Sequence, residues 1–229
     1  MDFNETVEKI SEAKPFQYIV QNLESTFGEP KLGGKSDLVT MLVRIILSQA
    51  TSDVNSHRTF KNLKARLKNW EAVLAADEPE IADAIRLGGL ANQKARVIKD
   101  LLRQIKETHG RISLKFVEKM LDEEARDFLT KFRGVGPKTV ACTLLFAAHK
   151  EVFPLDTHIF RILKRMGILP EKISDVNAHK LLDELVPSGK FYSLHINLIR
   201  LGKQICRPRE PLCEQCPLIE YCDYGLQRF

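Results

Sequence analysis

The chain has 229 residues, 44% hydrophobic and 28% charged, so it is long enough to bury a sizeable core as one domain or as two small ones. No apolar run is long enough to cross a membrane, which argues against an integral membrane protein. The net charge of +5 arises late in the chain: residues 1–130 hold 20 basic and 20 acidic side chains, whereas residues 131–229 hold 15 and 10. A surface for a polyanion and an ordinary basic domain both fit this distribution.

The N-terminal segment MDFNETVEKISEAKPF is charged and lacks the apolar stretch of a secretory signal. We therefore expect a protein that stays in the reducing cytoplasm, where disulfides are rare.

Helical periodicity begins in SDLVTMLVRIILSQ, for which Ser36 or Asp37 is the expected N-cap. The apolar positions spaced to share one face of this helix are Leu38, Met41, Leu42, Ile45 and Ile46.

The segment NQKARVIKDLLRQIKETHG predicts a second amphipathic helix, with Asn92 as its cap and Gly110 as its end. Its apolar stripe comprises Val97, Ile98, Leu101, Leu102 and Ile105. LDEEARDFLTKF and HINLIRLGKQI follow the same period, and EVFPL is too short and isolated to build a sheet. The sequence therefore predicts an all-α fold.

The segment LTKFRGVGPKTVACTLL, residues 129–145, carries the most specific pattern. An amphipathic helix is expected to end at Gly134, and Val135 and Gly136 complete a turn before Pro137 opens a new helix. Backbone amides in this turn and in the first turn of the new helix would point outward without a partner, which suits a phosphate. A tight turn between packed helices is the alternative reading.

Lys138 and Asp156 each have a plain and a chemical interpretation. Lys138 follows the turn, where the positive end of the helix dipole disfavours the ammonium form, as an amine nucleophile requires; a simple phosphate contact is the alternative. Asp156 precedes the helical pattern HIFRILKRM and is by default a helix cap. His158 is expected to be a structural hydrogen-bonding residue, and Cys142 a core residue.

The remaining cysteines are concentrated in CRPREPLCEQCPLIEYC, at Cys206, Cys213, Cys216 and Cys222. In a reducing compartment such a group is typical of a metal site. Zinc and an iron-sulfur cluster both use four thiolates, and the single C-x2-C pair does not choose between them.

Four motifs together resemble endonuclease III, a DNA glycosylase with abasic-site lyase activity. They are ILSQATSD, the helix-hairpin-helix FRGVGPKTV, PLDTHIFRILKR and the terminal C-x6-C-x2-C-x5-C, in the family's order from about residue 30 to residue 222. The resemblance implies a helical domain at 30–149 containing the hairpin, a second domain from 1–29 and 150–229, and double-stranded DNA bound in the cleft between the two. It also implies a 4Fe-4S cluster on the four cysteines, in a loop at 206–222 whose Arg207 and Arg209 face phosphates.

The resemblance further implies that Lys138 attacks the sugar C1′ of a damaged nucleotide, displaces the base and forms a Schiff base, after which β-elimination nicks the strand. Asp156 would face this lysine and stabilise the cationic sugar. Gln49 and Leu90 match the two residues that the family inserts into the opened duplex; otherwise they are a helix-end glutamine and a core leucine. In QATSD the acidic residue falls at Asp53, four positions after Gln49 instead of three, which affects the expected damage preference.

We therefore expect a base-excision repair enzyme for oxidised pyrimidines in double-stranded DNA, monomeric, cytoplasmic, prokaryotic and associated with the nucleoid. A sibling glycosylase for mismatched or deaminated bases and a non-catalytic DNA-binding module are the alternatives. Lys138 argues against a purely monofunctional sibling, and the pair of Lys138 and Asp156 argues against a passive module.

Overall fold

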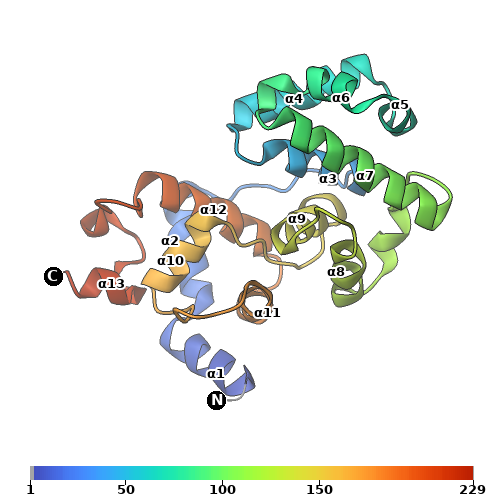
Figure 1. The fold of residues 1–229 in the computed structure, drawn as a ribbon. Helices are drawn as coiled ribbons and strands as arrows, with labels where there is room; N and C mark the ends of the chain where they lie inside the picture. The colour runs from blue at the N-terminus through green and yellow to red at the C-terminus, as the bar shows by residue number, and fades with distance from the viewer. Residues whose placement is uncertain (1–2, 229) are drawn as a thin grey trace. The chain divides into compact units, whose positions relative to one another are not determined.

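The computed structural model describes residues 3–228, which form helices and turns without a strand, as expected for an all-α protein. The chain divides into two compact units, one of Gly34–Lys150 and the other of Met1–Gly33 with Glu151–Phe229 (Figure 1). No helix in the part of the chain that the structure describes is long and apolar enough to cross a membrane.

The unit Gly34–Lys150 is built around α7, the long helix Ala91–His109, which packs against α3, α5, α6 and η1 (Figure 1). Side-chain oxygens of Asp37, Ser52, Asn69 and Asp77 accept the first free amides of α3 to α6 and so fix where these helices begin. The elements are α3 (Leu38–Ser48), α4 (Asp53–Arg66), α5 (Trp70–Ala75), α6 (Glu78–Ala84), η1 (Arg86–Gly88), α7, η2 (Lys115–Lys119), α8 (Asp122–Thr130), α9 (Pro137–Thr143) and η3 (Leu144–Ala148).

Helix α3 buries a wider face than its period predicts. Met41 and Ile45, expected in the core, are only partly covered, whereas Val39, Val43 and Leu47 are completely buried. The reason is that α3 contacts α4, α7, α9 and η3, so it has neighbours on several sides. The amphipathic pattern identified the helix but not the number of helices around it.

Helix α7 begins one residue before the expected cap. Leu90 is the N-cap residue and Asn92 lies inside the first turn, so the assignment of Asn92 as cap was wrong. Leu90 has left-handed backbone angles (φ 51°, ψ 35°) and makes no side-chain cap. The predicted end at Gly110 is confirmed, because that glycine has a φ of 70° and its amide donates to the Lys106 carbonyl at 2.7 Å.

Helix α8 ends at Thr130, four residues before the expected Gly134. The chain tightens here: the amides of Lys131 and Phe132 donate to carbonyls three residues earlier, each at 3.3 Å. Gly134 then takes a φ of 86°, which reverses the chain before α9.

The other unit combines the N-terminal helices with the C-terminal part of the chain. Helix α12 packs on α2 and α10, and Gly202 of α12 lies so close to His158 of α10 that a Cβ there would be 2.7 Å from the His158 Cβ. The elements are α1 (Phe3–Ala13), α2 (Phe16–Phe27), α10 (Thr157–Arg165), α11 (Asp175–Leu185), α12 (Phe191–Gln204), η4 (Cys213–Gln215), η5 (Ile219–Tyr221) and α13 (Asp223–Leu226).

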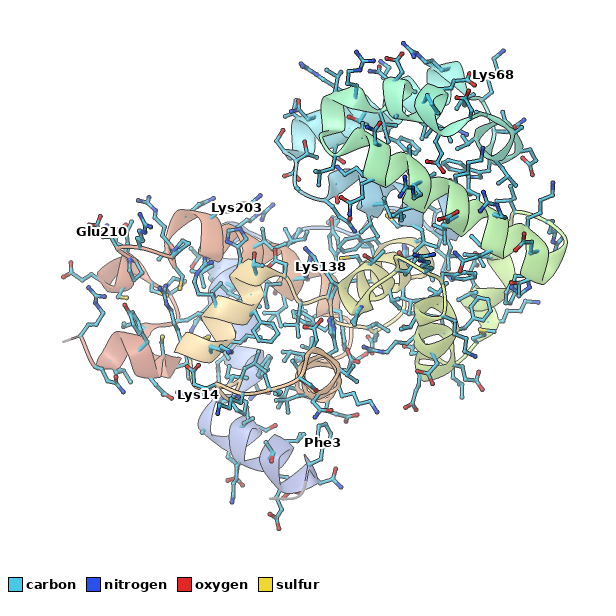
Figure 2. The ribbon with its side chains drawn as sticks, viewed as in Figure 1. Phe3, Lys14, Lys68, Lys138, Lys203 and Glu210 are labelled. Carbon is cyan, nitrogen blue, oxygen red and sulfur yellow. The ribbon has the colours of Figure 1, made fainter. Side chains whose placement is uncertain are left out.

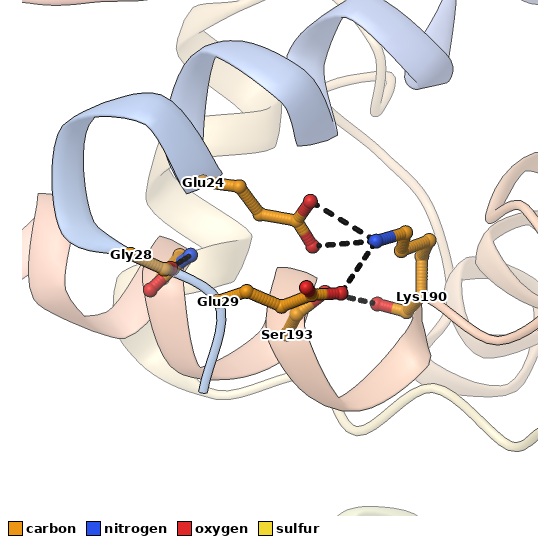
Figure 3. A network of polar contacts seen from close by, with 6 residues as sticks. Glu24, Gly28, Glu29, Lys190 and Ser193 are labelled. Carbon is orange, nitrogen blue, oxygen red and sulfur yellow. Dashed lines mark hydrogen bonds and ion pairs between the residues drawn. The ribbon is translucent and has the colours of Figure 1, made fainter. Parts of the chain in front are cut away.

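A charged network joins the end of α2 to the start of α12. Lys190 Nζ donates to both carboxylate oxygens of Glu24, at 3.0 and 3.1 Å, and to Glu29 at 2.7 Å (Figure 3). Because Lys190 is distant from both partners in sequence, these ion pairs connect the N-terminal segment to the C-terminal half of its unit.

Candidate functional site

The hairpin before α9 leaves several backbone donors free. The amides of Gly136, Lys138 and Thr139 donate to no acceptor among the described residues. The expectation that all amides of the turn are free is corrected at Val135, whose amide donates to the Phe132 carbonyl at 3.1 Å and whose side chain is buried. Pro137 occupies the first helical position, as predicted.

Lys138 is the second residue of α9 (Figure 2). Its side chain is exposed, and its amine makes no hydrogen bond or ion pair with another residue of the described chain. An amine in this state is available to a ligand, since no protein carboxylate or carbonyl holds it.

Asp156 is the N-cap of α10, and one of its carboxylate oxygens accepts the Ile159 amide at 2.8 Å. This confirms the capping interpretation. The other carboxylate oxygen accepts no hydrogen bond from a described residue, and the side chain is half-buried. Asp156 therefore caps a helix with one oxygen and keeps the second available.

Gln49 and Leu90 both lie at ends of helices with their side chains outward. Gln49 follows the last residue of α3 and is exposed. Leu90 precedes α7 and is 56% exposed, so it is not a core leucine. Exposing a leucine this far leaves most of its apolar surface in water.

Helix α7 contacts the segments that carry these residues. Val97 packs on the hairpin so closely that a Cβ on Gly134 would lie 2.9 Å from its methyl carbon. Gln104 accepts the Arg133 amide at 3.1 Å. The structure thus places Gln49, Leu90 and the hairpin with Lys138 in the unit built around α7, whereas Asp156 and the four C-terminal cysteines belong to the other unit.

The four C-terminal cysteines line one small cavity, together with Arg165 and apolar side chains. Burial, and then the proximity of the other three thiols, raises the pKa of Cys216 to about 11; burial also raises the pKa of Cys222. Among the described residues, no three His, Cys, Asp or Glu side chains are gathered so as to hold a single metal ion. Four thiols around a shared cavity are the donor set that fits a cluster of several atoms.

Two arginines of α10 anchor the start of this loop, and the sequence reasoning missed both. Arg161 donates to the carbonyls of Gly202 and Cys206 at 2.9 and 2.7 Å. Arg165 donates to the Cys206 sulfur at 3.3 Å and to the Arg207 carbonyl at 2.7 Å. The only signal was their helical spacing of four residues, which does not show what they face.

Arg207 and Arg209 are both exposed. Arg207 Nε donates to the Gln204 carbonyl at 3.1 Å, which still leaves other guanidinium donors facing water.

Residues 43–188 match the HhH-GPD superfamily of base excision DNA repair proteins, which is more than half of the chain. The chain belongs to this superfamily. Its resemblance to endonuclease III is confirmed by endonuclease III of Sulfolobus acidocaldarius, which is 31% identical over 196 residues and covers 85% of each chain. A candidate DNA glycosylase of Arabidopsis thaliana is 36% identical over 191 residues, 80% of this chain and 65% of that protein. The chain thus spans slightly less than two thirds of this plant relative's length.

Solved structures of other proteins share the fold of this chain. A trapped covalent intermediate of endonuclease III with DNA has a TM-score of 0.78 at 24% identity, and the match covers 94% of this chain and 98% of that one. At this identity the likeness establishes the fold alone. The superfamily membership makes the chain a member of a DNA glycosylase family.

Within this HhH-GPD chain, one buried residue was missed by the sequence reasoning. Lys94 in the first turn of α7 is 3% exposed, and its ammonium donates to the Leu47 and Gly88 carbonyls at 2.9 and 2.8 Å. In the sequence it falls on the stripe of α7 next to Ala95, and a lysine there is normally read as solvated. The available signal was the place of this lysine on the otherwise apolar stripe of α7.

Proposed function

We propose that the protein is a DNA glycosylase with abasic-site lyase activity, which removes oxidised pyrimidines from double-stranded DNA. The observation that carries the proposal is Lys138: an exposed amine without a partner among residues 3–228, on the helix after the GVG turn of an HhH-GPD chain. The proposal is also supported by the endonuclease III relative, which is 31% identical over 196 residues.

The chemistry assigned to Lys138 begins with attack of its neutral amine on C1′ of the damaged nucleotide. The bond between C1′ and the base breaks, and the base leaves with the electron pair and with one proton given up by the amine. The second amine proton passes to the ring oxygen as the sugar opens, which gives an imine. Removal of the C2′ proton then expels the 3′ phosphate oxygen, which nicks the strand, and water finally hydrolyses the imine to release the enzyme.

Asp156 is the residue to which we assign stabilisation of positive charge on the sugar as the base leaves. Its uncommitted carboxylate oxygen supports this assignment, since the capping bond uses only the other oxygen. The same oxygen can accept and return protons during formation and hydrolysis of the imine.

DNA is held by groups that do not read the base sequence. The free amides at Gly136 and Lys138 suit a phosphate, and Arg207 and Arg209 suit the backbone as exposed cations. Gln49 and Leu90 are assigned to the gap that opens when the damaged nucleotide leaves the stack. Cys206, Cys213, Cys216 and Cys222 would hold a 4Fe-4S cluster that ties down the basic loop.

The experiment offers the protein a panel of duplexes, each with one defined lesion: thymine glycol, uracil, a G·T mismatch or an abasic site. Borohydride added during turnover should trap a covalent adduct on the thymine glycol and abasic duplexes. Lys138→Gln should abolish trapping and base release but still bind the lesion duplex, because glutamine cannot form the imine.

Lys131→Gln is the matched control, since Lys131 is also an exposed lysine in the turn before the hairpin. It should trap like the wild type. If Lys138→Gln traps efficiently, the nucleophile lies elsewhere; if the wild type acts only on uracil or the mismatch, the sibling activity replaces the proposal. A wild type that neither traps nor cuts any duplex would be a non-catalytic DNA-binding module.

A further inference from the structure

Lys94 has its amine in the core of its unit and forms no ion pair with a carboxylate of the described residues. Its side chain is 3% exposed, and desolvation by burial lowers its pKa. Its ammonium is satisfied instead by two backbone carbonyls, those of Leu47 at 2.9 Å and Gly88 at 2.8 Å. Burying an amine is costly unless it is hydrogen-bonded, so these two bonds offset part of the cost of burying Lys94.

The first acceptor belongs to the end of α3. Helix α3 ends at Ser48, so the Leu47 carbonyl is one of the last four, which have no partner inside the helix. A cation at this end is favoured by the helix dipole. Gln49 is the second residue after Leu47, and Ala50, which follows it, has a φ of 51°.

The second acceptor belongs to the turn before α7. Gly88 is followed by Gly89 and Leu90, which both have positive φ values, 68° and 51°. Ala50 and Leu90 are therefore two non-glycine residues in the left-handed region, which side chains with a Cβ rarely adopt. A conformation of this kind persists only where the surroundings enforce it.

The two strained segments lie against each other. A Cβ on Gly89 would be 3.9 Å from the Ala50 carbonyl oxygen, which is ordinary contact distance. Lys94 thus joins the carbonyl two residues before Gln49 to the carbonyl two residues before Leu90.

We propose that Lys94 is a positioning residue that fixes the segments bearing Gln49 and Leu90 relative to each other, so that both side chains can occupy one opened base pair. This inference rests on the proposed function, in which these two residues fill the gap left by the extruded nucleotide. Lys94 acts through them and does not itself contact DNA.

The test compares Lys94→Met with Lys99→Met. Both lysines are on α7, but the Lys99 amine donates to the Ala76 carbonyl, away from the two segments. Each variant is first checked for folding by circular dichroism, and then assayed in single turnover on a thymine glycol duplex. Lys94→Met should lose between about tenfold and a hundredfold in base release, because small errors in position have effects of this size. Lys99→Met should stay within about twofold of the wild type, since its bond lies away from both segments.

A second substrate separates positioning from general damage. Borohydride trapping on a single-stranded oligonucleotide with one abasic site needs no base pair to be opened. Lys94→Met should therefore trap on this strand nearly as fast as the wild type, whereas loss of folding would slow both reactions. If Lys94→Met does not fold, Lys94→Gln, which keeps amide donors without the charge, takes its place.

Leu90→Ala provides a further criterion. If Lys94 acts through Leu90, the double variant Lys94→Met/Leu90→Ala should be little slower than the slower single variant. The inference is overturned if the two effects multiply, if Lys94→Met equals Lys99→Met, or if it slows the duplex and single-strand reactions equally. A wild type without activity on either substrate would overturn the proposed function, and this inference with it.

Discussion

At the scale of single residues, Asp156 shows that a plain structural role and a chemical role can share one side chain. Its cap bond to the Ile159 amide explains why an acidic or amide residue occurs there, but not why a carboxylate does. Asparagine and aspartate cap helices about equally well. Replacing Asp156 by asparagine therefore removes the charge and keeps the helix cap.

We expect Asp156→Asn to leave the unfolding free energy within about 0.5 kcal/mol of the wild type. Base release in single turnover should fall by about a hundredfold or more, because the carboxylate acts on charge that develops in the transition state. Urea unfolding and single-turnover rates on the lesion duplex measure the two effects.

Asp37→Asn is the control, since Asp37 caps α3 by accepting the Thr40 amide at 2.8 Å. That variant should keep both stability and rate. Full activity in Asp156→Asn would reduce Asp156 to a helix cap.

At the scale of elements, the segment after α12 exposes cations whose backbone is already held by α10. The backbone carbonyls of Arg207 and Pro208 accept hydrogen bonds from Arg165, so α10 holds this loop, and Arg207 adds one bond from its Nε to the Gln204 carbonyl. The Arg209 guanidinium and the remaining Arg207 donors are exposed, which is the basis of the proposal that they contact phosphates.

Arg207→Ala and Arg209→Ala should each weaken binding to undamaged duplex and reduce the slope of log K against log salt by about one unit or less. The lesion preference should not change, because phosphate contacts carry no base information. Arg111→Ala, an exposed arginine after the far end of α7, is the control. A changed lesion preference in either loop variant would mean that this loop reads damage.

The network of Lys190 with Glu24 and Glu29 (Figure 3) gives its unit a dependence on pH. Hydrogen bonding to Glu29 and then to Glu24 raises the Lys190 pKa above 10.5, and the bond from Lys190 lowers the Glu29 pKa below 4.5. The Lys190 contribution is complete below pH 10.5 and is lost as the pH rises through its folded pKa. The Glu29 contribution is complete above pH 4.5 and is lost as the pH falls through its folded pKa.

Lys190→Met should therefore lower the unfolding free energy by a small amount that is constant between these limits and shrinks toward both extremes. The loss is small because Glu29 is exposed and Lys190 is only partly buried, so water screens their ion pair. Urea unfolding across the pH range measures it, with Lys172→Met, an exposed lysine on the loop before α11, as control. If the difference in unfolding free energy between the wild type and Lys190→Met were the same at every pH, the assignment would be contradicted.

At the scale of the whole molecule, the cysteine segment of residues 206–222 has short 3-10 turns and few buried side chains of its own. Ordering of such a segment is expected to depend on what its thiols bind. Protein prepared without oxygen should be yellow-brown, with iron and sulfide in equal amounts. Cys213→Ser should lose the colour and expose residues 206–222 to proteases, while the unit Gly34–Lys150 keeps its helices.

Cys142→Ser is the matched control, because Cys142 is buried in α9 and lies in the other unit. It should keep the colour and the iron. One equivalent of zinc in colourless protein would contradict the iron-sulfur assignment.

The sequence by itself determined the all-α class, the period of several helices and the family. Helical period, the Gly110 end and Pro137 at the start of α9 are local features, and each depends on residues within one or two turns of the chain. The four motifs identified endonuclease III for the same reason, since each is a short run with a fixed spacing.

Tertiary structure alone decided which side chains are enclosed and what they contact. Met41 is only partly buried whereas Val43 is completely buried, and Leu90 is exposed. Lys94 is buried and donates to two carbonyls from other elements. Arg165 found its partners more than forty residues along the chain. A local pattern cannot give these results, because burial and hydrogen bonding depend on every helix that packs around a residue, and those neighbours are brought together only when the chain folds.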